Sequence, residues 1–264
     1  MPTNTDSTYF KVRSFFRAQI LNLLGMYSKP APGIHILNGH RIENEAEPET
    51  FRSLLSELSK EVKFVRFEDA VEMIERHENP KDPLVAFSFD DGFMECYEVF
   101  APVLEEFGTN AMFFVNPNYV DGDEAYIKNF NENTVLTHNK RPMRWQHLKE
   151  LSNKGFLIGA HTMDHFMINS TDKEKLTYEI VNCKSAIEQH IDKPCEYFAF
   201  PYGKSSEANE VSIDLALSTY SHVFAQSEWK RYYSFNERVI NRRQFEVFWP
   251  IRHINYFLSY KKRY

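Results

Sequence analysis

The chain has 264 residues, of which 42% are hydrophobic and 15% aromatic, a composition that fits a globular protein and excludes a disordered one. Its formal net charge of −6 argues against a broad nucleic-acid-binding surface. The three cysteines, Cys96, Cys183 and Cys195, are too scattered for a disulfide framework or a zinc knuckle, so we expect buried free thiols.

Residues 1–32 are predicted to form an extension that precedes the main domain. Apolar residues between Tyr9 and Met26 recur at helical spacing, and Lys11, Arg13 and Arg17 add positive charge. Such a helix either packs on the domain or lies against a membrane or a partner. No apolar run is long enough to span a membrane and no export signal is visible, so the sequence predicts a cytoplasmic protein that this segment could hold near a membrane.

Residues 33–230 are predicted to form the main domain, in which strands and helices alternate. The predicted strands are 34–37, 62–66, 84–89, 111–115, 156–160, 197–200 and 222–225. The predicted helices are 49–58, 67–76, 94–107, 145–154, 171–191 and 211–219, and 116–140 is predicted to be a long polar loop. This alternation predicts an α/β fold with a parallel sheet, in open or barrel form. The aromatic and basic residues 231–264 are predicted to be a C-terminal extension.

Polar clusters follow three of the predicted strands, at the ends where ligands bind in such folds. The first is Asp90-Asp91-Gly92. Because neighbouring side chains on a strand point to opposite faces, the two carboxylates can do different work: one can ligate a cation and the other can face a substrate water. The alternative is an ordinary solvated turn.

The second cluster contains His161 and His165, which are four residues apart. This spacing corresponds to one helical turn, so both imidazoles can face one point. Two neutral imidazoles and one carboxylate would leave open positions for water on a divalent metal. Zinc is favoured by the ligand types, and nickel, cobalt, iron and manganese are alternatives.

The third cluster is Pro201-Tyr202-Gly203. Pro201 and Gly203 shape a turn, which leaves the backbone N–H of Tyr202 free to donate a hydrogen bond. Each cluster is weak evidence alone, and an ordinary strand-to-loop turn explains this one equally well.

Together the clusters resemble the polysaccharide deacetylase family, also called the NodB-homology domain or carbohydrate esterase family 4. Ser88-Phe89-Asp90-Asp91-Gly92 is similar to the first family motif, T-F-D-D-G. His161-Thr162-Met163-Asp164-His165 is similar to the second, H-[ST]-x-x-H, and Pro201-Tyr202 to part of the third, R-x-P-Y. The resemblance runs from about residue 33 to about residue 225.

The resemblance implies a distorted (β/α) barrel and hydrolysis of an N-acetyl group on a sugar. Asp91, His161 and His165 would bind the metal, and Asp90 would be the base that deprotonates the water held by that metal. The backbone N–H of Tyr202 would stabilise the oxyanion, with Pro201 and Tyr202 at the substrate site. The expected partner is an N-acetylated carbohydrate, and no nucleic acid is expected.

This sequence departs from the family pattern at two positions. Ala199 stands where the third motif has an arginine, as in a subset of the family with F-A-[YF]-P-Y-G. The late motif that supplies a general acid has no clear match, which leaves His40 and His253 as candidates, with His40 preferred. Trp145 either forms a wall of the acetyl pocket or packs in the core.

Two other functions stay open from the sequence. A catalytically silent carbohydrate-binding domain would lack Asp90 or a metal ligand, and here all of them are present. An amidohydrolase acting on a non-sugar or N-formyl substrate would use the same metal chemistry with a different pocket.

Overall fold

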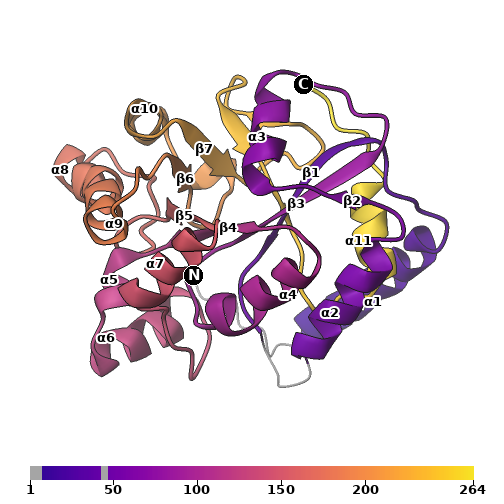
Figure 1. The fold of residues 1–264 in the computed structure, drawn as a ribbon, viewed down its shortest axis with the longest axis horizontal. Coiled ribbons are helices and arrows are strands. Elements are labelled where there is room, and N and C mark those ends of the chain that lie inside the picture. The colour runs from indigo at the N-terminus through magenta and orange to yellow at the C-terminus, as the bar shows by residue number, and fades with distance from the viewer. Residues whose placement is uncertain (1–7, 43–46) are drawn as a thin grey trace.

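The computed structural model describes residues 8–42 and 47–264, with the side chains of residues 8–15 and 205 left aside (Figure 1). Its centre is one curved, mostly parallel sheet, and helices cover its outer side. The strands are β1 (Gly33–Gly39), β2 (Lys63–Phe64), β3 (Pro83–Phe89), β4 (Ala111–Val115), β5 (Leu157–Ala160), β6 (Tyr197–Ala199), β7 (His222–Ala225), β8 (Tyr233–Ser234), β9 (Val239–Asn241) and β10 (Arg243–Gln244). The predicted α/β class with parallel strands is confirmed.

The order of strands follows the chain from β3 to β7. Along the sheet it is β10-β1-β3-β4-β5-β6-β7-β9-β8, with β2 also paired to β3. The antiparallel pair in this sheet is β8 with β9. Because β3 to β7 are parallel neighbours, their carboxyl ends lie at one rim of the sheet, and the three polar clusters come together there.

One short segment, residues 239–244, joins the two ends of the sheet. Its first part, β9, pairs with β7 (Ala225 opposite Asn241), and its last part, β10, pairs with β1 (Leu37 opposite Arg243). Arg242 lies at the crossing point, where its N–H donates to the carbonyl of Ala225. We predicted a domain that ends at residue 230, whereas strands of the same sheet continue to residue 244.

Successive side chains along each strand point alternately to the inside of the curved sheet and to its outside. Ile34, Ile36 and Ala86 belong to a cluster with α3 (Phe67–Glu75), whereas Leu37 and Phe87 belong to the larger cluster. Asn38 and Ser88 continue the first set toward the carboxyl ends of β1 and β3, and both are fully buried. The interior is therefore apolar at one end and polar at the other.

Helices surround this sheet (Figure 1). They are α1 (Thr8–Gly25), α2 (Glu47–Leu58), α3, α4 (Ala101–Glu106), α5 (Pro117–Asp121), α6 (Glu124–Asn129), α7 (Trp145–Asn153), α8 (Lys173–Leu176), α9 (Cys183–Ile191), α10 (Glu210–Thr219) and α11 (Ile251–Leu258). Helices α1, α2 and α11 form one group in Figure 1, and α8, α9 and α10 another. Cys96, Cys183 and Cys195 are buried free thiols, as predicted.

Several predicted boundaries were wrong. The predicted loop 116–140 contains α5, α6 and a π-helical turn (Phe130–Thr134), which are too short to show an amphipathic period. The predicted helix 171–191 begins at Lys173, because the Asp172 side chain accepts a hydrogen bond from the Lys175 N–H (3.1 Å). The predicted strand 62–66 is reduced to β2.

Helix α1 has two different faces. Leu21 is buried, the side-chain oxygen of Asn22 accepts a hydrogen bond from Nε2 of His253 of α11 (2.9 Å), and Gly25 lies directly on the backbone of Arg252. The other face exposes a row of large apolar side chains, Phe16, Ile20, Leu23 and Leu24, and Tyr27 is exposed just after the helix. The helix therefore both packs on the domain and presents an apolar surface. Within the described residues, no helix is long and apolar enough to cross a membrane.

Candidate active site

A cavity of about 340 Å³ opens at the carboxyl ends of β1, β3, β5 and β6. Six of the residues predicted from the sequence line it: His40, Asp90, Asp91, His161, His165 and Tyr202. They come from four separate parts of the chain, and the parallel sheet brings them to one place.

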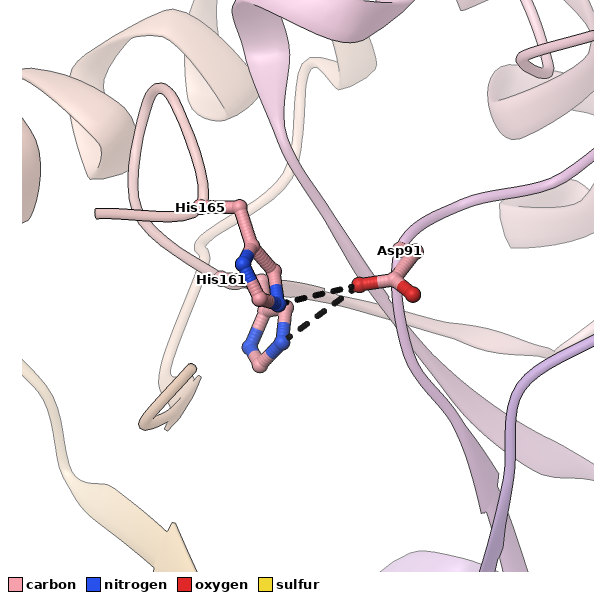
Figure 2. Close-up of side chains that lie close together, drawn as sticks. All are labelled: Asp91, His161 and His165. Carbon is pink, nitrogen blue, oxygen red and sulfur yellow. Dashed lines mark ion pairs between the residues drawn. The ribbon is translucent and has the colours of Figure 1, made fainter. Parts of the chain in front are cut away.

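Asp91, His161 and His165 converge on one point (Figure 2). The Oδ1 atom of Asp91 lies 3.7 Å from Nε2 of His161 and 3.4 Å from Nε2 of His165. Two ligands of one tetrahedral zinc ion, each about 2.1 Å from it, would be about 3.4 Å apart. All three side chains are buried. Both distances from Oδ1 are close to this value, and the three donor atoms all lie within 4.8 Å of one another, so they can share one ion.

The hydrogen bonds of these side chains also fit a metal. The Nδ1 of His161 lies 2.8 Å from the carbonyl oxygen of Ala199, which can only accept, so Nδ1 carries the proton and Nε2 presents its lone pair. Oδ1 of Asp91 is buried with no hydrogen-bond partner among the described residues. A buried carboxylate oxygen left without a donor is costly, and a cation would satisfy it.

Burial keeps both imidazoles neutral. It lowers the pKa of His161 and the pKa of His165 to about 4, so both rings are in the form that ligates metals at neutral pH. Burial also raises the pKa of the Asp91 carboxyl. These three residues would hold a divalent cation.

The two histidines converge through a loop rather than through a helical turn, which corrects the prediction. Residues 161–170 are not helical, and Thr162 (φ 65°) and His165 (φ 55°) adopt left-handed backbone conformations. The side-chain amide of Asn116 donates to the carbonyls of His161 and Thr162 and fixes this loop. Non-glycine residues in this sparsely populated backbone region are common at functional sites.

Asp90 has a different environment from its neighbour. Arg242 donates from Nη1 to Oδ1 (2.7 Å) and from Nη2 to Oδ2 (3.0 Å), and Asn38 donates to Oδ2 (2.8 Å). Burial alone would raise the pKa of Asp90, but the charge and hydrogen bonds of Arg242 outweigh it and hold the pKa below its usual range. Asp90 is therefore ionised, and Oδ1 keeps one lone pair for another donor.

Arg242 is the main residue that the sequence analysis missed. It is fully buried, and Nη1 also donates to Asn38 (2.6 Å) and Ser88 (3.2 Å). Arg242 thus orients Asp90 in a chain that has Ala199 where the third family motif has an arginine. The only sequence signal is the pair Arg242-Arg243 after a short apolar run, which resembles any basic surface segment.

His40 and Tyr202 also line the cavity, His40 beside Asp90 and Tyr202 beside His165. The Nε2 of His40 is 4.0 Å from Oδ2 of Asp90, and its side chain is 23% exposed, so it can reach both Asp90 and a ligand in the cavity. Tyr202 (φ 63°) turns its ring edge-on to His165, with ring centroids 4.7 Å apart. No described residue accepts a hydrogen bond from the Tyr202 N–H.

Three other candidates lie away from the cavity. Pro201 is buried and shapes the turn before Tyr202 without lining the cavity. Trp145 stacks on His190 of α9 (centroids 4.2 Å apart) and donates to Asp121 (2.7 Å), so it forms no wall of this pocket. The candidate acid His253 is at the contact between α1 and α11. Their positions depend on helix packing, which motif spacing does not reveal.

The remaining wall of the cavity was not predicted. Residues 134–136 close one side, and Leu136 exposes its side chain (57%) with a left-handed backbone (φ 53°). Gln226, Gln244 and Glu246 line another side, where the Gln244 amide donates to Glu246 (2.7 Å). This cavity combines the predicted site residues with neutral amides and a carboxylate that can bind hydroxyl groups.

Comparison with known proteins gives three results. A family model described as polysaccharide deacetylase matches residues 77–219. YxkH of Bacillus subtilis (strain 168), whose name places it among the polysaccharide deacetylases, is 22% identical over 135 residues. That match covers 51% of this chain and 42% of the relative, so the chain matches less than half the length of this curated relative.

Solved structures share the fold. IcaB from Ammonifex degensii superposes with a TM-score of 0.69 at 19% identity, over 88% of this chain and 99% of that one. The Streptococcus pyogenes deacetylase PplD, solved with acetate, gives a TM-score of 0.62 at 16% identity, over 86% and 97% of the two chains. At these identities the likeness establishes the fold alone, which is the predicted barrel-like arrangement of parallel strands.

Proposed function

Because the chain belongs to the polysaccharide deacetylase family, we propose that it hydrolyses the N-acetyl group of an N-acetylated sugar in a polysaccharide, an oligosaccharide or a sugar precursor. Water and the amide would give acetate and a free amine on the sugar. The observation that carries this proposal is the pairing, in one cavity, of a three-ligand metal set with a second, separately held carboxylate.

Asp91, His161 and His165 would hold a divalent metal, with zinc favoured by one carboxylate and two imidazoles. When bound, such an ion polarises the amide carbonyl and lowers the pKa of water. The neutral imidazoles and the unpartnered Oδ1 of Asp91 support this assignment.

Asp90 would accept the proton of the attacking water. Arg242 and Asn38 occupy three of its lone-pair positions and fix its plane, so the remaining position on Oδ1 has a defined direction. The low pKa of this carboxyl means that the acceptor form is always present at neutral pH.

Two further groups would complete the reaction. His40, beside Asp90 and partly exposed to the cavity, would donate a proton to the leaving amine. The free N–H of Tyr202 would donate to the oxyanion that forms on the amide carbonyl. Gln226, Gln244 and Glu246 are placed to bind hydroxyl groups of the sugar.

The test is release of acetate from chitin oligomers by the zinc-loaded protein, compared with Asp90→Asn and Asp91→Asn. Both variants keep the size of the side chain, and Asp192→Asn, at an exposed carboxylate paired with Lys149, is the matched control. Acetate from the wild type and the control but from neither site variant supports the proposal.

Two results would support a different function instead of deacetylation. Formate released from N-formyl compounds, with no acetate from any N-acetylated sugar, would indicate an amidohydrolase with another substrate. Binding of the oligomers without any hydrolysis would indicate a carbohydrate-binding domain.

We also propose that α1 holds the enzyme against a membrane surface. Phe16, Ile20 and Leu23 of α1 are exposed at helical spacing, and Tyr27 is exposed just after the helix. Arg17 is exposed beside Phe16, Lys29 is exposed shortly after the helix, and the sequence of α1 contains no acidic residue. Apolar and basic side chains on one helix are typical of helices that lie in the interface of an anionic bilayer.

A further inference from the structure

A second cavity lies at the opposite end of β1 from the active site. Its volume is about 310 Å³, and it is lined by the residues that precede β1 and β3, by Tyr232, and by the segment after α11. Seven residues of strand, about 20 Å, separate it from the cavity that contains Asp90. It takes no part in the proposed hydrolysis.

The lining of this cavity is strongly basic. Three lysines, Lys81, Lys261 and Lys262, line it, together with Asn79, Pro80 and Tyr232, and no carboxylate does so among the described residues. Lys81 and Lys261 are exposed, whereas Lys262 is only 7% exposed. Long-range repulsion between these cations favours an anion in the space that they share.

Lys262 is a buried cation without an acidic partner in the described part of the chain. Its Nζ has one long hydrogen bond, to the carbonyl of Asn241 (3.4 Å), and lies 5.4 Å from the ring centre of Tyr232. Burial lowers the pKa of the Lys262 ammonium to about 7. Placing an ammonium group in a protein interior without a counter-charge costs several kcal/mol, and a bound anion would offset that cost and keep Lys262 charged.

Tyr232 supplies a second donor. Its hydroxyl oxygen accepts a hydrogen bond from the Ile34 N–H (3.0 Å), and no described residue accepts its proton. Gly33 (φ 134°) leaves room for this hydroxyl because it has no side chain, whereas a Cβ there would approach the hydroxyl to 2.8 Å. A buried ammonium and an oriented hydroxyl thus line the same space.

We propose that this cavity binds a phosphate group, either as inorganic phosphate or as the phosphate of a monoester, through Lys262, Tyr232 and the two exposed lysines. Phosphate offers several acceptor oxygens and up to two negative charges, which matches one buried cation, two exposed cations and one hydroxyl. A water molecule occupies about 30 Å³ in the liquid, so the cavity also has room for a small organic substituent.

The experiment is calorimetric titration of the full chain with inorganic phosphate, glycerol phosphate and vesicles that contain phosphatidic acid. Saturable binding of one phosphate per chain is expected, and Lys262→Met should weaken it at least tenfold. The matched control is Lys184→Met, since Lys184 also lies over a tyrosine ring (5.3 Å from Tyr220) but near the carboxylate of Glu188 (3.8 Å). The ligand that binds most tightly identifies the source of the phosphate group.

Lys262→Met should fold, because it replaces an uncompensated buried charge with an apolar side chain of similar length. Its melting temperature without phosphate should equal or exceed that of the wild type, and its acetate release should be unchanged. If it fails to fold, Lys81→Met combined with Lys261→Met, at two exposed positions, should weaken phosphate binding severalfold. No saturable binding of any of the three ligands by the wild type, or full binding by Lys262→Met, would overturn the proposal.

Discussion

Arg242 and Asp90 form a fully buried, two-point ion pair across the place where the two ends of the sheet meet. The arginine comes from the residue between β9 and β10, and the aspartate follows β3, 152 residues earlier in the chain. One side-chain pair therefore links the closure of the sheet to the carboxylate that we propose as the base.

Breaking this pair should destabilise the protein. We expect Arg242→Met to lower the free energy of unfolding by about 3–5 kcal/mol, because Asp90 is left as an unpaired buried charge. The double variant Asp90→Asn with Arg242→Met should recover a large part of this loss, since neither charge then remains. Urea unfolding of the two single variants and the double variant measures the coupling, and strictly additive losses would contradict a direct pair.

Metal binding should depend on the three converging ligands. Zinc at about a hundred times its dissociation constant should raise the melting temperature of the wild type by about 5–10 °C. His161→Asn should lose both this shift and the bound zinc. His222→Asn is the control, because His222 also pairs with a carboxylate, Glu75 (2.7 Å), but without a second histidine. Equal zinc content in His161→Asn and the wild type would refute the site.

His40 should act in catalysis without affecting the metal. We expect His40→Asn to lower kcat for acetate release about a hundredfold or more, which is typical of the loss of a general acid, with zinc content unchanged. Trp145→Phe and His253→Asn are the comparison variants, since both residues lie away from the cavity. A large loss of kcat in His253→Asn and none in His40→Asn would transfer the role of acid to His253.

His35 should make the protein sensitive to acid. Burial, followed by the charge of Lys262, lowers the pKa of His35 from 6.5 to about 4. Between these values the unfolded chain binds a proton that the folded chain does not, so stability falls as the pH falls through this range.

His35→Gln should remove that contribution while keeping a donor for the carbonyl of Ala31. Relative to the variant, the wild type should lose about 1.4 kcal/mol of stability for each pH unit between pH 6.5 and 4. Urea unfolding at pH 6.5, 5.5 and 4.5, with a chelator present, measures the difference. Parallel curves for the two proteins would show that His35 does not titrate in this way.

The exposed face of α1 should bind anionic vesicles. We expect Ile20→Ser combined with Leu23→Ser to abolish sedimentation with phosphatidylglycerol vesicles, because each side chain is more than half exposed. Val211→Ser, at an exposed apolar position on α10, should sediment like the wild type. Substitutions are better than deletion of the residues before Pro30, since deletion would also uncover the face of α11 that α1 covers. Sedimentation of the double variant at the wild-type level would exclude this surface.

The α/β class and most of the candidate site follow from the residue pattern alone. Strands with two buried faces are visible as apolar runs, and their carboxyl ends must meet at one rim when they pair in parallel. Asp90, Asp91, His161, His165 and Tyr202 could therefore be grouped from the sequence, because each lies within a few residues after such a strand.

The side chains that surround this group of residues depend on long-range packing. Arg242 reaches Asp90 because residues 239–244 pair with β7 on one side and with β1 on the other, a relationship between distant segments that no local period encodes. Long-range packing also decides that His40, and not His253, lines the cavity. The position of Trp145 likewise follows from the packing of α7 on α9. Local residue patterns fix strands, turns and the residues at their ends, whereas long-range packing fixes which side chains meet.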